Sequence, residues 1–114
     1  MENQNYLPGG ITQEQLDGWK KNGRVLKIEV HTKDDKATCY LKEADLKVLK
    51  RMFAVYRNDL IGAGEIAINN LWLGGDSCIK QPANIEEEKV RAAACLEAIT
   101  VIDLPQSTSD LIKN

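Results

Sequence analysis

The sequence contains a single histidine, His31, among 114 residues. Histidine is the commonest general acid–base group and the usual partner of a nucleophilic serine or cysteine, so its scarcity excludes most such catalytic arrangements. His31 alternates with apolar residues and is expected on the polar face of a strand. The carboxylates of Asp34-Asp35 and of Glu86 to Glu88 fit a turn and a helix start. We therefore expect no enzyme activity, no cofactor and no metal.

Cysteine is also scarce, with three residues, Cys39, Cys78 and Cys95, and no C-x-x-C pair. An odd and widely spaced set argues against a disulfide framework. Cys39 and Cys95 lie among apolar residues and are predicted to be core. Two alternatives remain open. One is a zinc site that combines the cysteines with His31, and the other is a thiol-dependent enzyme or regulator that uses Cys78, the cysteine in the most loop-like context.

No excess of basic charge is present, because 15 basic and 17 acidic residues give a net charge of −2. Nonspecific nucleic-acid binders usually carry a basic excess, since release of counterions from phosphate drives their binding. The main basic cluster has a helical spacing that predicts the solvent-facing side of a helix. It consists of Lys47, Lys50, Arg51 and Arg57. A nucleic-acid partner is therefore disfavoured, and an accessory nucleic-acid-binding protein of a mobile element stays an alternative that uses this cluster.

Long apolar runs are absent as well. No stretch approaches the roughly 18 apolar residues of a membrane span. The first residues, MENQN, lack the basic start and apolar stretch of a signal peptide. We therefore expect a cytoplasmic protein with no membrane partner, and its length corresponds to one domain.

Local patterns predict an α+β fold that begins with a short helix. Residues 1–11 include Pro8-Gly9-Gly10 and show no periodicity, which predicts a flexible N-terminal segment. Thr12 and Gln15 fit a capping box at the start of the helix, and Gly23 follows its predicted end. The residues that this helix can bury are Leu16, Trp19 and Ile11.

Two alternating segments predict an antiparallel β-hairpin. The first spans residues 24–32, and a polar turn over residues 33–36 follows it. Its apolar face consists of Leu26, Ile28 and Val30. In the second, Ala37, Cys39 and Leu41 alternate with Thr38, Tyr40 and Lys42. Helices must cover the apolar face, because an isolated hairpin is marginally stable in water.

A bundle of about three helices is predicted to follow the hairpin. The first spans residues 44–58 and has an apolar stripe of Leu46, Leu49, Phe53 and Tyr56. The second begins after Asp59. There, Gly62 and Gly64 either permit close packing against a neighbour or delay the helix start to about Glu65.

The second helix is expected to end at Gly74-Gly75-Asp76, and a loop to Asn84 precedes the third. The third helix begins near Ile85 and ends before Pro105. Its wide apolar stripe consists of Ala92, Cys95, Leu96, Ile99 and Ile102. We expect a single domain over residues 12–104 and a flexible tail over residues 105–114.

The segment from Asn69 to Asp76, NNLWLGGD, has two compatible interpretations. In one, Trp72 fills the core at a helix end and Gly74 closes the helix. In the other, Trp72 and Leu73 anchor another protein, because tryptophan is enriched at binding hot spots.

This segment resembles small proteins encoded among the tail genes of prophages in Bacteroidetes-type bacteria, which are similar to phage tail assembly chaperones. The resemblance covers residues 16–102, and its most particular element is the Asn-x-Trp-Leu-Gly-Gly-Asp stretch. It extends to Gly18-Trp19, Gly23-Arg24-Val25, Ile28-Glu29-Val30, Cys39-Tyr40-Leu41-Lys42 and Ile79. The chain departs from the family's pattern after Asp76, where Gln81-Pro82-Ala83-Asn84 stands in place of an acidic pair that leads directly into the last helix.

The resemblance implies a hairpin followed by a helical bundle, without cofactor or catalysis. It also implies that the protein coats the long, apolar tape-measure protein until tube subunits polymerise around it in the host cytoplasm. The expected partners are the tape-measure protein and other tail components, and self-association as a homo-oligomer would cover a long partner cooperatively. Exposed apolar grooves are needed to take amphipathic helices. The candidate interaction residues, each of which could equally be core, are Leu60, Ile61, Trp72, Leu73, Leu96, Ile99 and Ile102.

Overall fold

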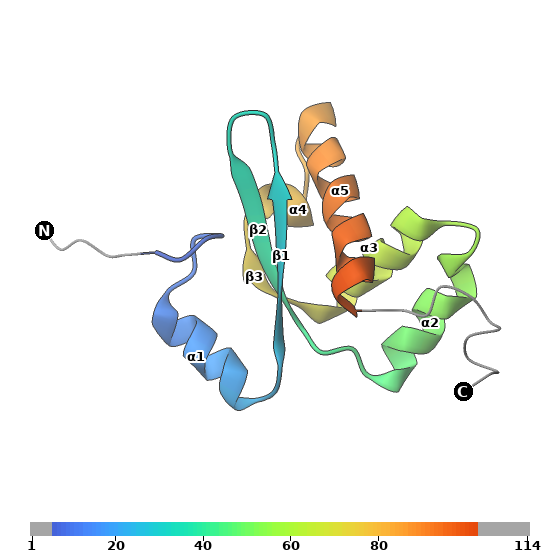
Figure 1. Ribbon diagram of the computed structural model, residues 1–114, viewed down its shortest axis with the longest axis horizontal. Helices are drawn as coiled ribbons and strands as arrows, with labels where there is room; N and C mark the ends of the chain where they lie inside the picture. The colour runs from blue at the N-terminus through green and yellow to red at the C-terminus, as the bar shows by residue number, and fades with distance from the viewer. Residues whose placement is uncertain (1–5, 103–114) are drawn as a thin grey trace, which may run out of the picture.

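The structure, a computed structural model that describes residues 6–102, has an α+β fold (Figure 1). This confirms the predicted fold class. The elements in chain order are α1 (Gln13–Lys21), β1 (Val25–His31), β2 (Lys36–Lys42), α2 (Leu46–Tyr56), α3 (Leu60–Leu71), β3 (Trp72–Gly75), α4 (Ser77–Lys80) and α5 (Ile85–Ile102). Within the described residues, no helix is both long enough and apolar enough to cross a membrane.

The predicted helix starts are confirmed, because side chains satisfy backbone N–H groups that a helix start leaves free. At α1, the Gln15 N–H donates to Thr12 Oγ1 at 3.1 Å and the Thr12 N–H donates to Gln15 Oε1 at 2.9 Å. The Gly62 N–H donates to Asp59 Oδ1 at 2.8 Å at the start of α3. At α5, the Glu87 N–H donates to Asn84 Oδ1 at 2.9 Å.

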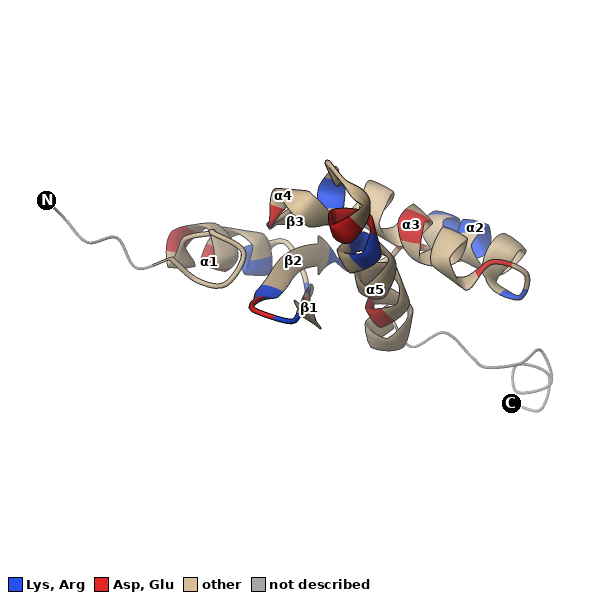
Figure 2. Ribbon diagram, turned by 90° about the horizontal axis from the view of Figure 1, so that it is seen from above, with Lys and Arg blue, Asp and Glu red and all other residues tan. Residues whose placement is uncertain are grey.

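The sheet is antiparallel with the order β1-β2-β3, and the predicted hairpin forms its first two strands. On the inner face, the pairs Leu26–Leu41, Ile28–Cys39 and Val30–Ala37 lie opposite one another and are buried. Helix α5 packs on β1, and α3 and α4 pack on β2. Figure 2 shows α1 on the other face, away from these helices.

Strand β2 is buried on both faces, which corrects the expectation that one of its faces is polar. Thr38 and Tyr40 are buried although they lie on the outer face. The Trp19 ring lies 5.9 Å from the Tyr40 ring, and the Tyr40 hydroxyl donates to the Pro8 carbonyl at 2.8 Å. Because Ile11 is also buried, the packed structure begins before the boundary expected at residue 12.

Strand β3 was expected to be a helix end followed by a loop, and this expectation is wrong. Residues 72–75 pair with β2, with Gly75 opposite Cys39 and Gly74 opposite Tyr40. Gly75 has a φ of +143°, and a methyl group there would overlap the Cys39 backbone, so only glycine fits. A short helix, α4, follows where the sequence predicted only a loop.

Asp76 closes this strand pairing. The Thr38 N–H donates to Asp76 Oδ2 at 2.8 Å, and the Asp76 N–H donates to the Thr38 carbonyl at 2.9 Å. Gly74, Gly75 and Asp76, at the end of the segment from Asn69 to Asp76, therefore have a structural role in forming the third strand.

The apolar stripe predicted for α2 is correct at Leu49 and Tyr56, which are half-buried and pack against the core, and wrong at Leu46 and Phe53. The residues that α2 buries are Val48 and Met52, whereas Leu46 and Phe53 are exposed. Helix α2 packs mainly on α3. The position of α3 therefore decides which side chains of α2 are buried.

Helices α3 and α5 approach closely at Gly64. A methyl group on Gly64 would overlap the backbone carbonyl and the Cβ of Cys95. Of the two predicted roles of the glycines, close packing is confirmed for Gly64, and the helix begins at Leu60 rather than at Glu65. The residues that α5 buries are Ala94, Cys95, Ala98 and Ile99.

We predict that Gly64→Ala lowers the free energy of unfolding by about 1–3 kcal/mol, because the added methyl group forces α3 away from α5. Urea denaturation measures this change. Gly18→Ala is the matched control, since Gly18 also lies in a helix but has nothing within 4 Å of an added Cβ. That variant should gain up to about 1 kcal/mol from helix propensity. A Gly64→Ala variant as stable as Gly18→Ala would contradict the packing at this crossing.

Candidate protein-binding surface

Three of the candidate residues are exposed at the crossing of α3 and α5. The exposed fractions are 47% for Leu60, 41% for Ile61 and 44% for Leu96. The helices touch where Gly64 meets Cys95. Ile61 and Leu96 each lie within one helical turn of that contact, and Leu60 lies about one turn from it. We call Leu60, Ile61 and Leu96 the α3–α5 surface.

A hollow of about 270 Å³ adjoins Ile61 between the two helices. It combines apolar and charged lining residues: Ile61, Glu65, Pro82, Glu88, Arg91 and Ala92. A ligand at the α3–α5 surface would therefore meet charges of both signs beside the apolar side chains.

Arg91 is the charged residue of this hollow that the structure holds most firmly. Its side chain is 13% exposed and donates to the carbonyls of Ile79 and Lys80 at 2.8 and 3.0 Å. It also donates to Asn69 Oδ1 at 3.1 Å, and its Nε lies 3.6 Å from Glu65 Oε2. The sequence analysis missed Arg91 because its partners lie on other elements and leave no local pattern.

Trp72 and Leu73 lie apart from this surface. Trp72 follows the C-terminal end of α3, roughly 16 Å of helix from Ile61. It is half-buried and packs against the core, with Lys80 Nζ 5.6 Å from its ring centroid. Leu73 lines a different hollow of about 430 Å³ together with Trp19.

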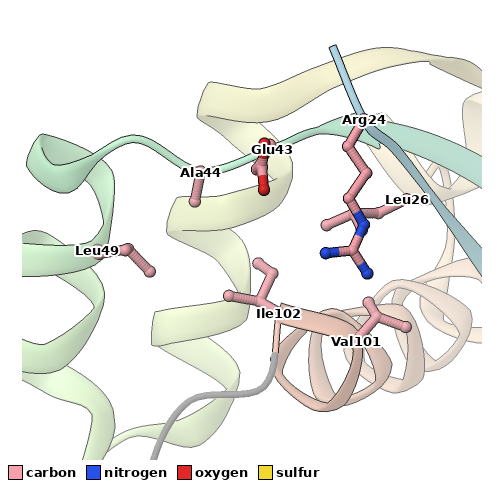
Figure 3. Close-up of a pocket in the computed structure, with 7 residues that line it drawn as sticks. All are labelled: Arg24, Leu26, Glu43, Ala44, Leu49, Val101 and Ile102. Carbon is pink, nitrogen blue, oxygen red and sulfur yellow. The ribbon is translucent and has the colours of Figure 1, made fainter. Parts of the chain in front are cut away.

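The remaining two candidates lie toward the end of α5. Ile99 is buried in the core, so it does not contribute to an exposed surface. Ile102 is half-buried and lines a pocket of about 150 Å³ with Val101, Leu26, Leu49, Ala44, Glu43 and Arg24. Figure 3 shows the Arg24 side chain reaching toward Val101, with Leu49 on the opposite side of the pocket.

The cysteines are not arranged as reactive thiols. Cys39 and Cys95 are buried as predicted, and burial raises their pKa values to about 12 and about 11. Burial, with a smaller effect from the Asp76 carboxylate, also raises the pKa of the half-buried Cys78. A raised pKa lowers the thiolate fraction at neutral pH, which disfavours the thiol-dependent alternative.

The residues of the zinc alternative do not gather at one point. The structure describes Cys39, Cys78, Cys95 and His31, and within residues 6–102 no three metal-ligand side chains lie close enough to share an ion.

The basic residues of α2 lie on the surface at one end of the molecule (Figure 2). Lys47, Lys50 and Arg51 are exposed, and Arg51 Nη1 donates to Asn70 Oδ1 at 3.4 Å. This agrees with the predicted solvent-facing side of a helix.

Comparisons with protein-family models, with curated proteins and with solved structures found no match for this chain.

We predict that iodoacetamide alkylates Cys78 more slowly at neutral pH than it alkylates a free peptide thiol, because burial holds the Cys78 pKa above its ordinary value. Mass-spectrometric peptide mapping over time gives the rate at each cysteine. The same chain in concentrated urea is the control, and there all three cysteines should react at peptide-like rates. A folded Cys78 that reacts faster than the peptide would restore the thiol-dependent alternative.

Proposed function

We propose that this chain is a non-enzymatic protein-binding module of phage tail assembly that shields the tape-measure protein in the host cytoplasm. The observation that carries the proposal is the α3–α5 surface, where three exposed aliphatic side chains each lie within about one helical turn of the contact between Gly64 and Cys95. Single exposed apolar residues are ordinary on protein surfaces, whereas several exposed apolar residues near one helix contact favour a site of interaction. The resemblance of residues 16–102 to tail assembly chaperones supports the choice of partner.

The chemistry of this surface suits an amphipathic helix. Such a helix presents apolar side chains at intervals of three and four residues, which can pack on Leu60, Ile61 and Leu96. Its polar side chains would meet Glu65, Glu88 and the anchored Arg91 at the adjoining hollow. Because these contacts recognise amphipathic character rather than one particular sequence, several segments of a long helical partner can bind in turn.

Trp72 has a structural role in this proposal and does not contribute to binding. Trp72 packs against the core and Gly74-Gly75-Asp76 forms the third strand, so the segment supports the fold that presents α3. We assign binding to the α3–α5 surface and not to Trp72. A Trp72→Ala variant would lose core packing as well, which makes it a poor test of binding.

We predict that Leu60→Ser and Leu96→Ser each weaken binding to the tape-measure protein about tenfold or more, because each removes an aliphatic side chain that binding would bury. Sequencing of the DNA that flanks the gene would identify the partner, which is expected to be encoded by a very long, coiled-coil-rich reading frame. Isothermal titration calorimetry with purified fragments of that protein measures Kd.

Leu46→Ser is the matched control for these two variants. Leu46 is 66% exposed at the start of α2. Its replacement is therefore the same leucine-to-serine change at an exposed position outside the α3–α5 surface. It should leave Kd within about twofold of the unmodified chain. If Leu46→Ser weakens binding as much as Leu96→Ser, or if neither surface variant weakens it, the assignment of this surface is wrong.

A further inference from the structure

Strand β1 is an edge strand whose outer backbone groups are unpaired within residues 6–102. The Thr32 N–H donates to the Asp35 carbonyl at 2.7 Å across the hairpin turn, which sets the phase of the ladder. The backbone N–H and C=O groups of Leu26, Ile28 and Val30 therefore point to β2. The N–H and C=O groups of the intervening residues point away from β2. These residues are Val25, Lys27, Glu29 and His31.

The hydrogen bonds on the other side of β2 confirm this alternation of hydrogen-bonded and non-hydrogen-bonded pairs. Thr38 lies opposite Glu29, and both its N–H and its C=O bond to Asp76 on the far side from β1. Glu29 and Thr38 therefore form a pair that does not exchange hydrogen bonds, as the alternation requires.

The edge of β1 lacks most features that usually prevent strand pairing between molecules. It is seven residues long, contains no proline and pairs with β2 without a bulge. Native edge strands are commonly short, interrupted or covered. Figure 2 shows α1 on one face of the sheet and α5 on the other.

The charges on β1 are complementary to the charges on a second copy of β1 that runs antiparallel to it. Lys27 and Glu29 lie on the outer face, with Lys27 Nζ 3.4 Å from Glu29 Oε2. When two copies of β1 pair antiparallel about a two-fold axis at Ile28, Lys27 of each copy lies opposite Glu29 of the other. A shift of two residues in either direction would instead place Lys27 opposite Lys27 or Glu29 opposite Glu29, which is unfavourable. The two-fold pairing at Ile28 is thus the favoured register.

We propose that a second copy of this chain pairs with β1, so that the two three-stranded sheets form one continuous six-stranded antiparallel sheet. The residues whose outer backbone groups pair across the axis are Val25, Lys27, Glu29 and His31. The inner face stays covered, because Leu26, Ile28 and Val30 remain packed under the helices of their own copy. The interface is separate from the α3–α5 surface, so this inference does not depend on the proposed function.

Sedimentation equilibrium of the full chain, up to roughly 100 µM, tests the pairing with charge variants. The unmodified chain is expected to dimerise. Lys27→Glu places glutamates opposite one another at two positions of the interface and is expected to raise the dimer Kd about tenfold or more. The double variant Lys27→Glu with Glu29→Lys restores opposite charges and is expected to restore the dimer.

Lys36→Glu is the matched control. Lys36 also contacts Glu29, at 3.3 Å, but lies on β2, so the substitution changes the net charge equally without facing the second copy. Its dimer Kd should stay within about threefold of the unmodified chain. A chain that remains monomeric throughout, or a Lys36→Glu variant that dissociates as much as Lys27→Glu, overturns the proposal.

Amide hydrogen exchange resolved by residue identifies the strand that pairs. In the dimer, the N–H groups of Lys27, Glu29 and His31 should exchange as slowly as those of Ile28 and Val30, which bond to β2. Dilution to the monomer should speed exchange at the first three only. A dimer in which the Lys27 and Glu29 amides exchange freely uses another surface and also overturns the proposal.

Discussion

The pairing of β3 with β2, closed by two hydrogen bonds between Asp76 and the backbone of Thr38, is the constraint on which the rest of the structure depends. It makes β2 the central strand of the three-stranded sheet. Because β3 follows α3 without a loop, the same pairing ties the C-terminal end of α3 to the sheet. Helix α3 then extends away from the sheet, and α5 packs across it at Gly64. The position of Leu60, Ile61 and Leu96 at that crossing therefore follows from a strand of four residues.

This arrangement separates the residues that build the fold from those available to a partner. Gly75 and Asp76 hold β3 against β2, and Trp72 packs on the core beside them. Arg91 ties α5 to the carbonyl groups at the end of α4. Leu60 and Ile61 lie at the opposite end of α3 and Leu96 lies on α5, and all three side chains are exposed. We infer that binding and stability can be tested separately in this protein.

The parts of the fold that could be predicted from sequence are those with a local physical signal. The capping box of Thr12, the alternation in β1 and the cap at Asp59 each involve residues within a few positions of one another. Strand β3 could not be predicted because its four residues, WLGG, do not alternate and two of them are glycines, which are depleted in strands. Its formation depends on Thr38 and Tyr40, which are more than 30 positions away. The expected tail over residues 105–114 lies outside the described residues.

The candidate surface was predicted only in part, for a related reason. Leu60, Ile61 and Leu96 are exposed, but the same apolar pattern also selected Ile99, which is buried, and Trp72, which packs on the core. A helical stripe shows which residues are apolar and not which neighbour covers them. For α2, that neighbour is α3, and it buries Val48 and Met52 instead of Leu46 and Phe53.

The most direct test of the central claim is an NMR titration of the isotope-labelled chain with a helical fragment of the tape-measure protein. The account predicts that chemical shifts change first at Leu60, Ile61 and Leu96 and around Arg91, and that signals from the outer face of the sheet stay in place. Changes confined to α2 or to the hollow beside Leu73, with Leu60 and Leu96 unaffected, would contradict it.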